Sequence, residues 1–254
     1  MLKTKNKLFK LVLTALLAAL VVGLQMVVGI PLGPFNITLT LIPIVFGSIT
    51  LGAGYGTALG LVFGLVVSIM SITGRDAGGQ AVFAASPAIA WVLCLLKGAA
   101  AGLCPALIYR AFKDKKAAPW VLVGASGLFI FIAGFAVGKI LKTGWSAKTV
   151  IIVCLAAIIA AAYLLIIHYA MKKDTAPVYL ASMIAPIANT GIFVAGMFIF
   201  FRPLLAEWAG GSDILLFVLT GIVGVNFILE FTVAVIFAPA IAMAAEALMK
   251  RHRT

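Results

Sequence analysis

Long apolar runs separated by helix-breaking residues dominate the pattern of hydrophobic and polar positions along the chain. Eight runs lie at about residues 9–29, 39–53, 55–72, 88–112, 119–141, 149–171, 178–201 and 213–247. A helix that crosses a bilayer needs about 20 predominantly apolar residues, so most of these runs are long enough to span one, and the second is short. The pattern predicts an all-α integral membrane protein with about eight membrane segments.

Prolines, glycines and polar residues interrupt the pattern between the runs. The segment Pro31-Leu-Gly-Pro-Phe-Asn-Ile-Thr38 forbids a continuous helix and favours an ordered external loop or a partial re-entry into the membrane. Longer loops are expected at residues 73–87 and 202–212.

Composition supports the same class. Of 254 residues, 64% are hydrophobic and 10% charged, with a mean hydropathy of +1.23, which leaves no room for a sizeable soluble catalytic domain. The net charge of +12 resides mainly on Lys and Arg at the ends of the apolar runs, where they meet anionic lipid head groups. We therefore exclude nucleic acid as a partner and expect one polytopic membrane domain over residues 1–254.

The basic residues also predict the orientation of the chain. The run from Leu8 to Ile30 is too long for a cleaved signal core and is expected to remain as the first spanning helix. With the N-terminus inside the cell, thirteen Lys and Arg residues flank the spans on the cytoplasmic side and five on the outside. The positive-inside rule thus predicts a cell-membrane protein with both termini cytoplasmic.

Residues 117–175 resemble an inserted helical hairpin. They are bracketed by two similar stretches, Lys115-Lys-Ala-Ala-Pro119 and Lys172-Lys-Asp-Thr-Ala-Pro177. Removing the insert leaves a core of six spans over residues 8–116 and 176–250.

Several kinds of chemistry have no motif in the chain. There is no GxxxxGK[ST], HExxH or GxSxG, and the three cysteines lie in apolar runs without CxxC spacing or His partners. We expect no enzyme activity, no metal and no cofactor.

Small residues recur every four positions in two runs. One set is Ala15, Ala19 and Gly23, and the other is Gly52, Gly56, Gly60 and Gly64. Such faces let helices approach closely, so the first set predicts either packing inside the bundle or an interface with a partner helix. For the glycines, internal close packing is the favoured interpretation.

Lys97 and Glu230 are ionisable residues deep within predicted spans. An intramembrane charge is costly and is a functional candidate by default, so either the two residues form a structural pair or Lys97 binds the carboxylate of a solute. Asn189, between Pro186 and Gly191, and Asn226, one turn before Glu230, either bind a polar ligand or join helices by hydrogen bonds.

Further candidates lie where a solute arrives from outside. Trp91 anchors its span at the interface or stacks on a ligand. The polar residues expected at the outer surface are Asn36, Thr38, Thr40, Arg75 and Asp76. The candidate substrate-binding set is Asn36, Thr38, Arg75, Trp91, Lys97, Asn189 and Asn226.

The basic start, Ala15-x-x-x-Ala19, Phe35-Asn-Ile-Thr-Leu-Thr-Leu-Ile-Pro43, Leu95-Leu-Lys-Gly98 and Pro186-Ile-Ala-Asn-Thr-Gly191 together resemble the substrate-binding S component of energy-coupling factor (ECF) vitamin transporters. The resemblance implies a six-helix core that captures a water-soluble vitamin and docks, through Ala15, Ala19 and Gly23, on a transmembrane T subunit joined to two ATPases. The insert departs from this pattern and must lie away from the T subunit. Pantothenate is the preferred substrate because Lys97 offers a cation, with folate and riboflavin open.

Other functions remain open. The main alternative is a stand-alone secondary transporter of a small organic anion, in which Lys97 and Glu230 relay protons. A membrane scaffold and an intramembrane enzyme using Glu230 are further alternatives.

Overall fold

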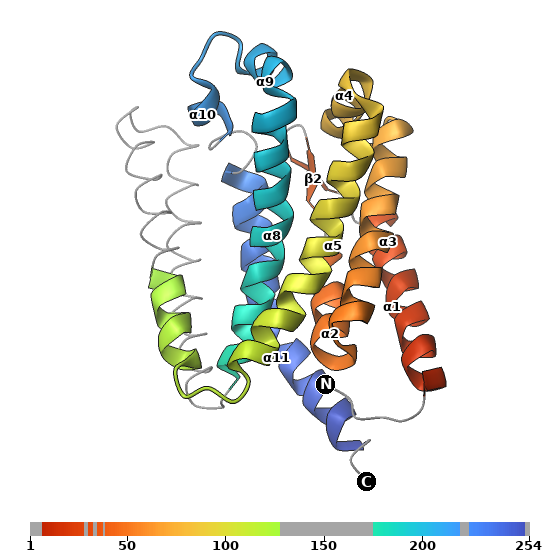
Figure 1. The fold of residues 1–254 in the computed structure, drawn as a ribbon, viewed down its shortest axis with the longest axis vertical. Helices are drawn as coiled ribbons and strands as arrows, with labels where there is room; N and C mark the ends of the chain where they lie inside the picture. The colour runs from red at the N-terminus through yellow and green to blue at the C-terminus, as the bar shows by residue number, and fades with distance from the viewer. Residues whose placement is uncertain are drawn as a thin grey trace.

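The structure, a computed structural model, describes residues 7–27, 30–32, 35–37, 39–127, 175–218 and 224–251. Within these ranges it is a helical bundle with one small antiparallel hairpin (Figure 1). Four helices are long and apolar enough to cross a membrane: α1 (Lys7–Val27), α3 (Ala53–Ile72), α5 (Pro87–Phe112) and α8 (Ala176–Phe200). The prediction of a multi-span helical membrane protein is confirmed at this level.

The last span is bent. In α11 (Gly224–Arg251) the segments Glu230–Ala238 and Ala240–Leu248 meet at 46° and make a fifth span if counted together. The bend falls at Pro239, which removes a backbone donor and opens the helix. Of the predicted run 213–247, the structure describes α10 (Ile214–Phe217) and α11, and residues 219–223 lie outside the described residues.

The second predicted run forms only half a span. Residues 31–38 contain the hairpin of β1 (Ile30–Leu32) and β2 (Phe35–Ile37), in which Pro31 pairs with Asn36. The hairpin leads into α2 (Leu41–Leu51), about 16 Å long and packed against α1, α3, α5, α8 and α11. This short helix fills the half of the bundle in which α1 begins and α11 ends (Figure 1).

Two predicted loops contain helices. Residues 73–87 hold α4 (Ala77–Ala85), and residues 202–212 hold α9 (Arg202–Ala209). The prediction of loops is thus corrected, since each segment contains a short helix, and Pro203 lies in the first turn of α9, where proline is compatible with a helix.

Glycines allow the backbones of α3 and α5 to come into direct contact. A Cβ atom on Gly60 would overlap the carbonyl oxygen of Gly98, and one on Gly64 would lie 2.5 Å from that of Cys94. Gly56 meets Gly102 in the same way, so internal packing of this glycine face is confirmed. Gly52 is not part of it, because its φ of 107° makes it the turn between α2 and α3.

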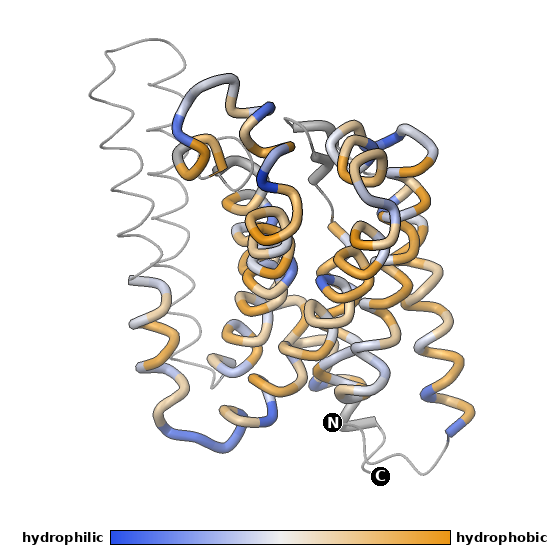
Figure 2. The backbone as a smooth tube through the Cα atoms, turned by 45° about the horizontal axis from the view of Figure 1, so that its top comes forward, coloured by the Kyte–Doolittle hydropathy of each residue, from blue (hydrophilic) through white to orange (hydrophobic). Residues whose placement is uncertain are grey.

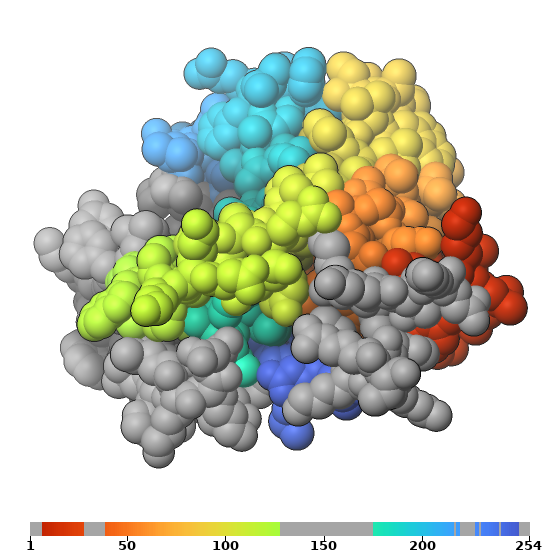
Figure 3. All heavy atoms as spheres, turned by 60° about the horizontal axis from the view of Figure 1, so that its bottom comes forward, coloured from red at the N-terminus to blue at the C-terminus, as the bar shows by residue number. Residues whose placement is uncertain are grey.

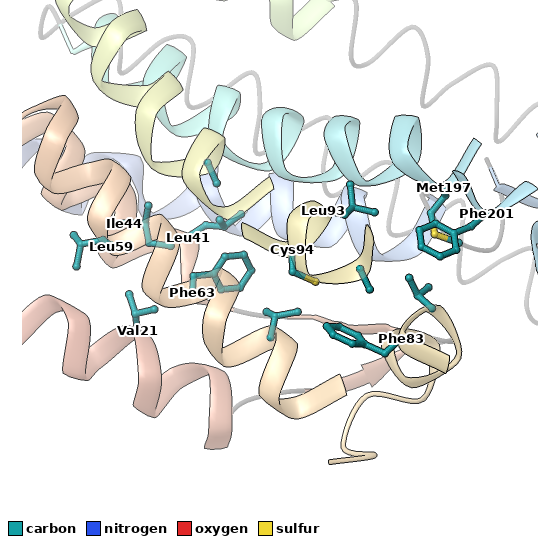
Figure 4. Packing of buried hydrophobic residues seen from close by; sticks show 14 of the residues in the cluster. Val21, Leu41, Ile44, Leu59, Phe63, Phe83, Leu93, Cys94, Met197 and Phe201 are labelled. Atoms are coloured by element: carbon teal, nitrogen blue, oxygen red, sulfur yellow. The ribbon is translucent and has the colours of Figure 1, made fainter. Parts of the chain in front are cut away.

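Apolar side chains from α1, α2, α3, α4, α5, α8 and α9 form a buried cluster around this contact, and Figure 4 shows part of it. Val21 comes from α1, Ile44 from α2, Phe63 from α3, Leu93 from α5 and Met197 from α8. A buried hydroxyl connects two of these helices, because Ser48 Oγ lies 2.7 Å from the carbonyl oxygen of Gly102.

The insert begins on the side of the bundle away from α1. Residues 118–127 are helical, and Ala118 and Leu122 pack against Tyr179 of α8 and Phe231 of α11. Seen from the end at which α1 begins, α1 forms one edge of the molecule and the start of the insert lies toward the opposite edge (Figure 3). The remainder of the predicted hairpin, residues 128–174, lies outside the described residues.

We expect Gly60→Ala to destabilise the protein by about 1–3 kcal/mol, because the added methyl group pushes α5 away from α3. The matched control is Gly54→Ala in the same helix, where a Cβ atom meets nothing within 4 Å. This control should leave stability unchanged or raise it by up to about 1 kcal/mol. Thermal unfolding in detergent distinguishes the two variants, and equal midpoints would contradict the close contact.

Candidate functional site

Lys97 lies midway along α5, on a half-buried face that packs against α8. Its ammonium Nζ is 4.7 Å from the ring centroid of Phe193 on α8, within cation–π range. Its charge also acts on Asp76. Glu230 is buried on α11, and its structural pairing with Lys97 stays a prediction.

Asn189 lies on the same face of α8, one turn before Phe193. The residue is 8% exposed, and its Oδ1 accepts no hydrogen bond from the described part of the chain. A buried amide oxygen without a donor costs about 1–3 kcal/mol, so an amide that only joined helices would be expected to have a partner. Three residues earlier, Pro186 removes the amide that would otherwise bond the Ser182 carbonyl.

Asp76 precedes α4 and is 9% exposed, which corrects its prediction as a surface residue. Its Oδ2 lies 3.5 Å from Ser71 Oγ, and its buried Oδ1 forms no hydrogen bond with the residues that the structure describes. Burial raises the pKa of this carboxyl group, and the charge of Lys97, the Gly79 amide and the Ser71 hydroxyl partly offset the rise. Gly79 is needed here, since a Cβ atom on it would overlap Ser71 Oγ.

The other predicted outer residues do not all join this group. Arg75 is exposed, whereas half-buried Trp91 packs edge-on against Phe83 with ring centroids 5.8 Å apart. Thr40, predicted at the surface, is fully buried, with Oγ1 3.4 Å from Oε1 of Gln25 on α1.

Three predicted residues lie wholly or partly outside the described structure. Asn36 lies in β2 and Asn226 in the first turn of α11, and their side chains lie outside the described structure. Thr38 lies outside the described residues altogether. The structure therefore brings Lys97 and Asn189 to one helix interface and adds buried Asp76, which the sequence analysis placed at the outer surface and outside the candidate substrate-binding set.

The face formed by Ala15, Ala19 and Gly23 is exposed. A Cβ atom on Gly23 would meet nothing within 4 Å, and only 17% of the most apolar window of α1 is buried, against 56% for α3. Packing inside the bundle does not explain this face. It is open to lipid or to a partner helix.

Chemically, the arrangement offers one cation, Lys97, and two buried acceptor oxygens, on Asp76 and Asn189. A solute with an anionic group and a hydrogen-bond donor matches these groups, whereas the described residues hold no cluster of three His, Cys, Asp or Glu suited to a metal ion. Comparison with protein-family models and with curated protein sequences finds no match to the chain.

We expect Asn189→Leu to stabilise the protein without solute by about 1–2 kcal/mol, because it removes a buried oxygen that has no donor. The control is Ser182→Ala, since the Ser182 hydroxyl already lies 2.9 Å from the Val178 carbonyl oxygen and its removal brings no such gain. Thermal unfolding in detergent measures both, and a loss of stability in Asn189→Leu would show that the amide has a structural partner.

Proposed function

We propose that the protein is the substrate-capture subunit of an ATP-driven importer, similar to the S component of ECF transporters, and that it binds a small vitamin bearing a carboxylate. Pantothenate is the preferred substrate, and folate and riboflavin are alternatives. The observation that carries the proposal is the α5–α8 interface, where half-buried Lys97 contacts an aromatic ring and buried Asn189 Oδ1 accepts no hydrogen bond from the described residues. Polar groups held in this way within a membrane are typical of a solute site.

The charge distribution supports capture from outside. The start of α1, the end of α5, the start of α8 and the end of α11 lie at one end of the bundle (Figure 1). Hydrophilic residues gather there after α5, including Lys113, Lys115 and Lys116 (Figure 2). The positive-inside rule makes this end cytoplasmic, with both termini on that side.

The position of α2 supports a closed cytoplasmic side. Because five helices surround α2 in that half of the bundle, a solute beside Lys97 enters from the outer end. Release into the cytoplasm then requires a rearrangement of the protein, for which the sequence contains no P-loop. Separate energising subunits, a T subunit and two ATPases, supply that work in this proposal.

The exposed face of α1 supports the docking of such a T subunit. The start of the insert packs against α8 and α11, so it leaves Ala15, Ala19 and Gly23 uncovered. We retain the six-helix core with an inserted hairpin as the proposed architecture.

Mass spectrometry of small molecules released from the detergent-purified protein tests the capture function first. We expect a retained vitamin, or binding of pantothenate in titration calorimetry, that Lys97→Met weakens at least about tenfold through loss of the cation. Leu96→Met, at an exposed neighbouring position, is the control and should bind as the wild type does. A protein that retains nothing and binds none of the three vitamins would contradict the proposal.

We further expect the double variant Ala15→Trp, Ala19→Trp to lose copurification with the T subunit and to keep vitamin binding, because two indole rings prevent close approach of a partner helix. Val92→Trp with Leu96→Trp, on an exposed face of α5, is the matched control and should keep the complex. If both double variants copurify with the T subunit, α1 is not the docking face.

Burial of Asp76 near the Lys97 charge favours the second candidate, a secondary transporter driven by protons. Uptake into liposomes that contain this chain alone, driven by a pH gradient, distinguishes it from the importer subunit, which is inactive without its partners.

A further inference from the structure

Asp76 precedes α4, which packs against α5, the helix that carries Lys97. The positive charge of Lys97 counteracts part of the rise in the pKa of the Asp76 carboxyl group. Among the described residues the two side chains form no contact ion pair, since Lys97 Nζ lies over the Phe193 ring and Asp76 Oδ1 accepts no hydrogen bond. The ammonium group is thus balanced through space, and its donors are not committed to a carboxylate.

Few other ionisable groups surround Asp76. Its helix, α4, packs against α3, α5 and β2, and neither α4 nor β2 contains an ionisable residue. Tyr55 of α3 lies at the opposite end of that helix, and Arg75 is exposed. On α5, the group that acts on the carboxylate is Lys97, and the other titratable residues of that helix are Cys94, Cys104, Tyr109 and Arg110.

On the basis of the proposed function, we propose that Asp76 is the resident counter-ion of Lys97, and that a solute carboxylate takes over this role while Asp76 takes up a proton from water. The site then holds one positive and one negative charge before and after binding. Without the proton, the solute would bring a second anion into a buried region that contains one cation, which is costly. Burial raises the pKa of Asp76, which favours the protonated form of its carboxyl group.

This exchange specifies the class of substrate. Pantothenate and folate carry carboxylates and can replace Asp76 beside Lys97, whereas riboflavin carries none. The exchange therefore assigns the protein to a carboxylate-bearing vitamin and makes Asp76 a residue that determines specificity.

The sign of the pH effect follows from linkage. Because the solute-bound protein holds one more proton than the free protein, affinity rises as the pH falls toward the pKa of Asp76 in the free protein. When binding takes up one proton, the affinity changes by at most about tenfold per pH unit. Below that pKa, Asp76 is already protonated and the dependence ends.

Calorimetric titration of the purified full-length protein with pantothenate, folate and riboflavin, at about pH 5.5 and about pH 7.5, tests the exchange. We expect a carboxylate-bearing vitamin to bind at least about tenfold more tightly at the lower pH. Asp76→Asn should bind that vitamin at the higher pH at least as tightly as the wild type does and lose the pH dependence. Asp114→Asn, which removes an exposed carboxylate just after the end of α5, is the control and should keep the dependence.

Two measurements do not depend on the folding of Asp76→Asn. Titration of the wild type in buffers of different ionisation enthalpy should report uptake of about one proton per solute near neutral pH. In the solute-free protein, infrared spectroscopy should show a buried carboxyl group whose pKa rises in Lys97→Met, because the balancing cation is removed.

Each contrary result has a distinct meaning. Binding of a carboxylate without proton uptake, weakened binding in Asp76→Asn, or selective binding of riboflavin overturns the exchange and leaves solute capture standing. Failure to bind any of the three vitamins at either pH overturns the proposed function and the exchange with it. An infrared titration that Lys97→Met leaves unchanged overturns the role of Asp76 as counter-ion.

Discussion

The backbone contact between α3 and α5 is the constraint on which the rest of the described structure depends. Helices in a membrane gain little from the hydrophobic effect when they associate, so close approach and dispersion must hold them together. Gly60 and Gly98 provide that approach. Since successive helical residues are rotated by about 100°, fixing Gly98 against α3 also directs its neighbour Lys97 away from α3, and the contact with Phe193 shows that it faces α8.

Buried polar groups in this bundle fall into two kinds. Ser68 and Ser182 place their hydroxyls within hydrogen-bond distance of carbonyl oxygens one turn earlier in their own helices, and thereby satisfy themselves locally. Asp76 and Asn189 instead retain oxygens that accept no hydrogen bond from the described part of the chain. The described residues do not offset the cost of burying these oxygens, and a bound solute is the simplest physical source of compensation.

The sequence predicted the long spans well because each is an apolar run bounded by proline, glycine or charge. It also identified the glycine face of α3, and the complementary face of α5 has the same signal, since Ala90, Cys94, Gly98, Gly102 and Ala106 recur every four residues. Lys97 and Asn189 were predictable because polar residues are rare within spans. The burial of Asp76 was not predictable, because it arises from tertiary packing of α4 against Ser71 and α5. The periodicity of the sequence does not reveal such packing.

The half-span formed by α2 connects packing with the proposed transport. An 11-residue helix is too short to cross a bilayer, and it is stable here because nearly all its residues are buried by its neighbours. The same burial places an apolar barrier on the proposed cytoplasmic side of Lys97. Movement of a solute past that barrier requires either separation of α2 from five helices or movement of the whole protein relative to the membrane. Movement of the whole protein leaves the contact between α3 and α5 intact. The uncovered face of α1 offers a partner protein a surface on which to dock and drive that movement.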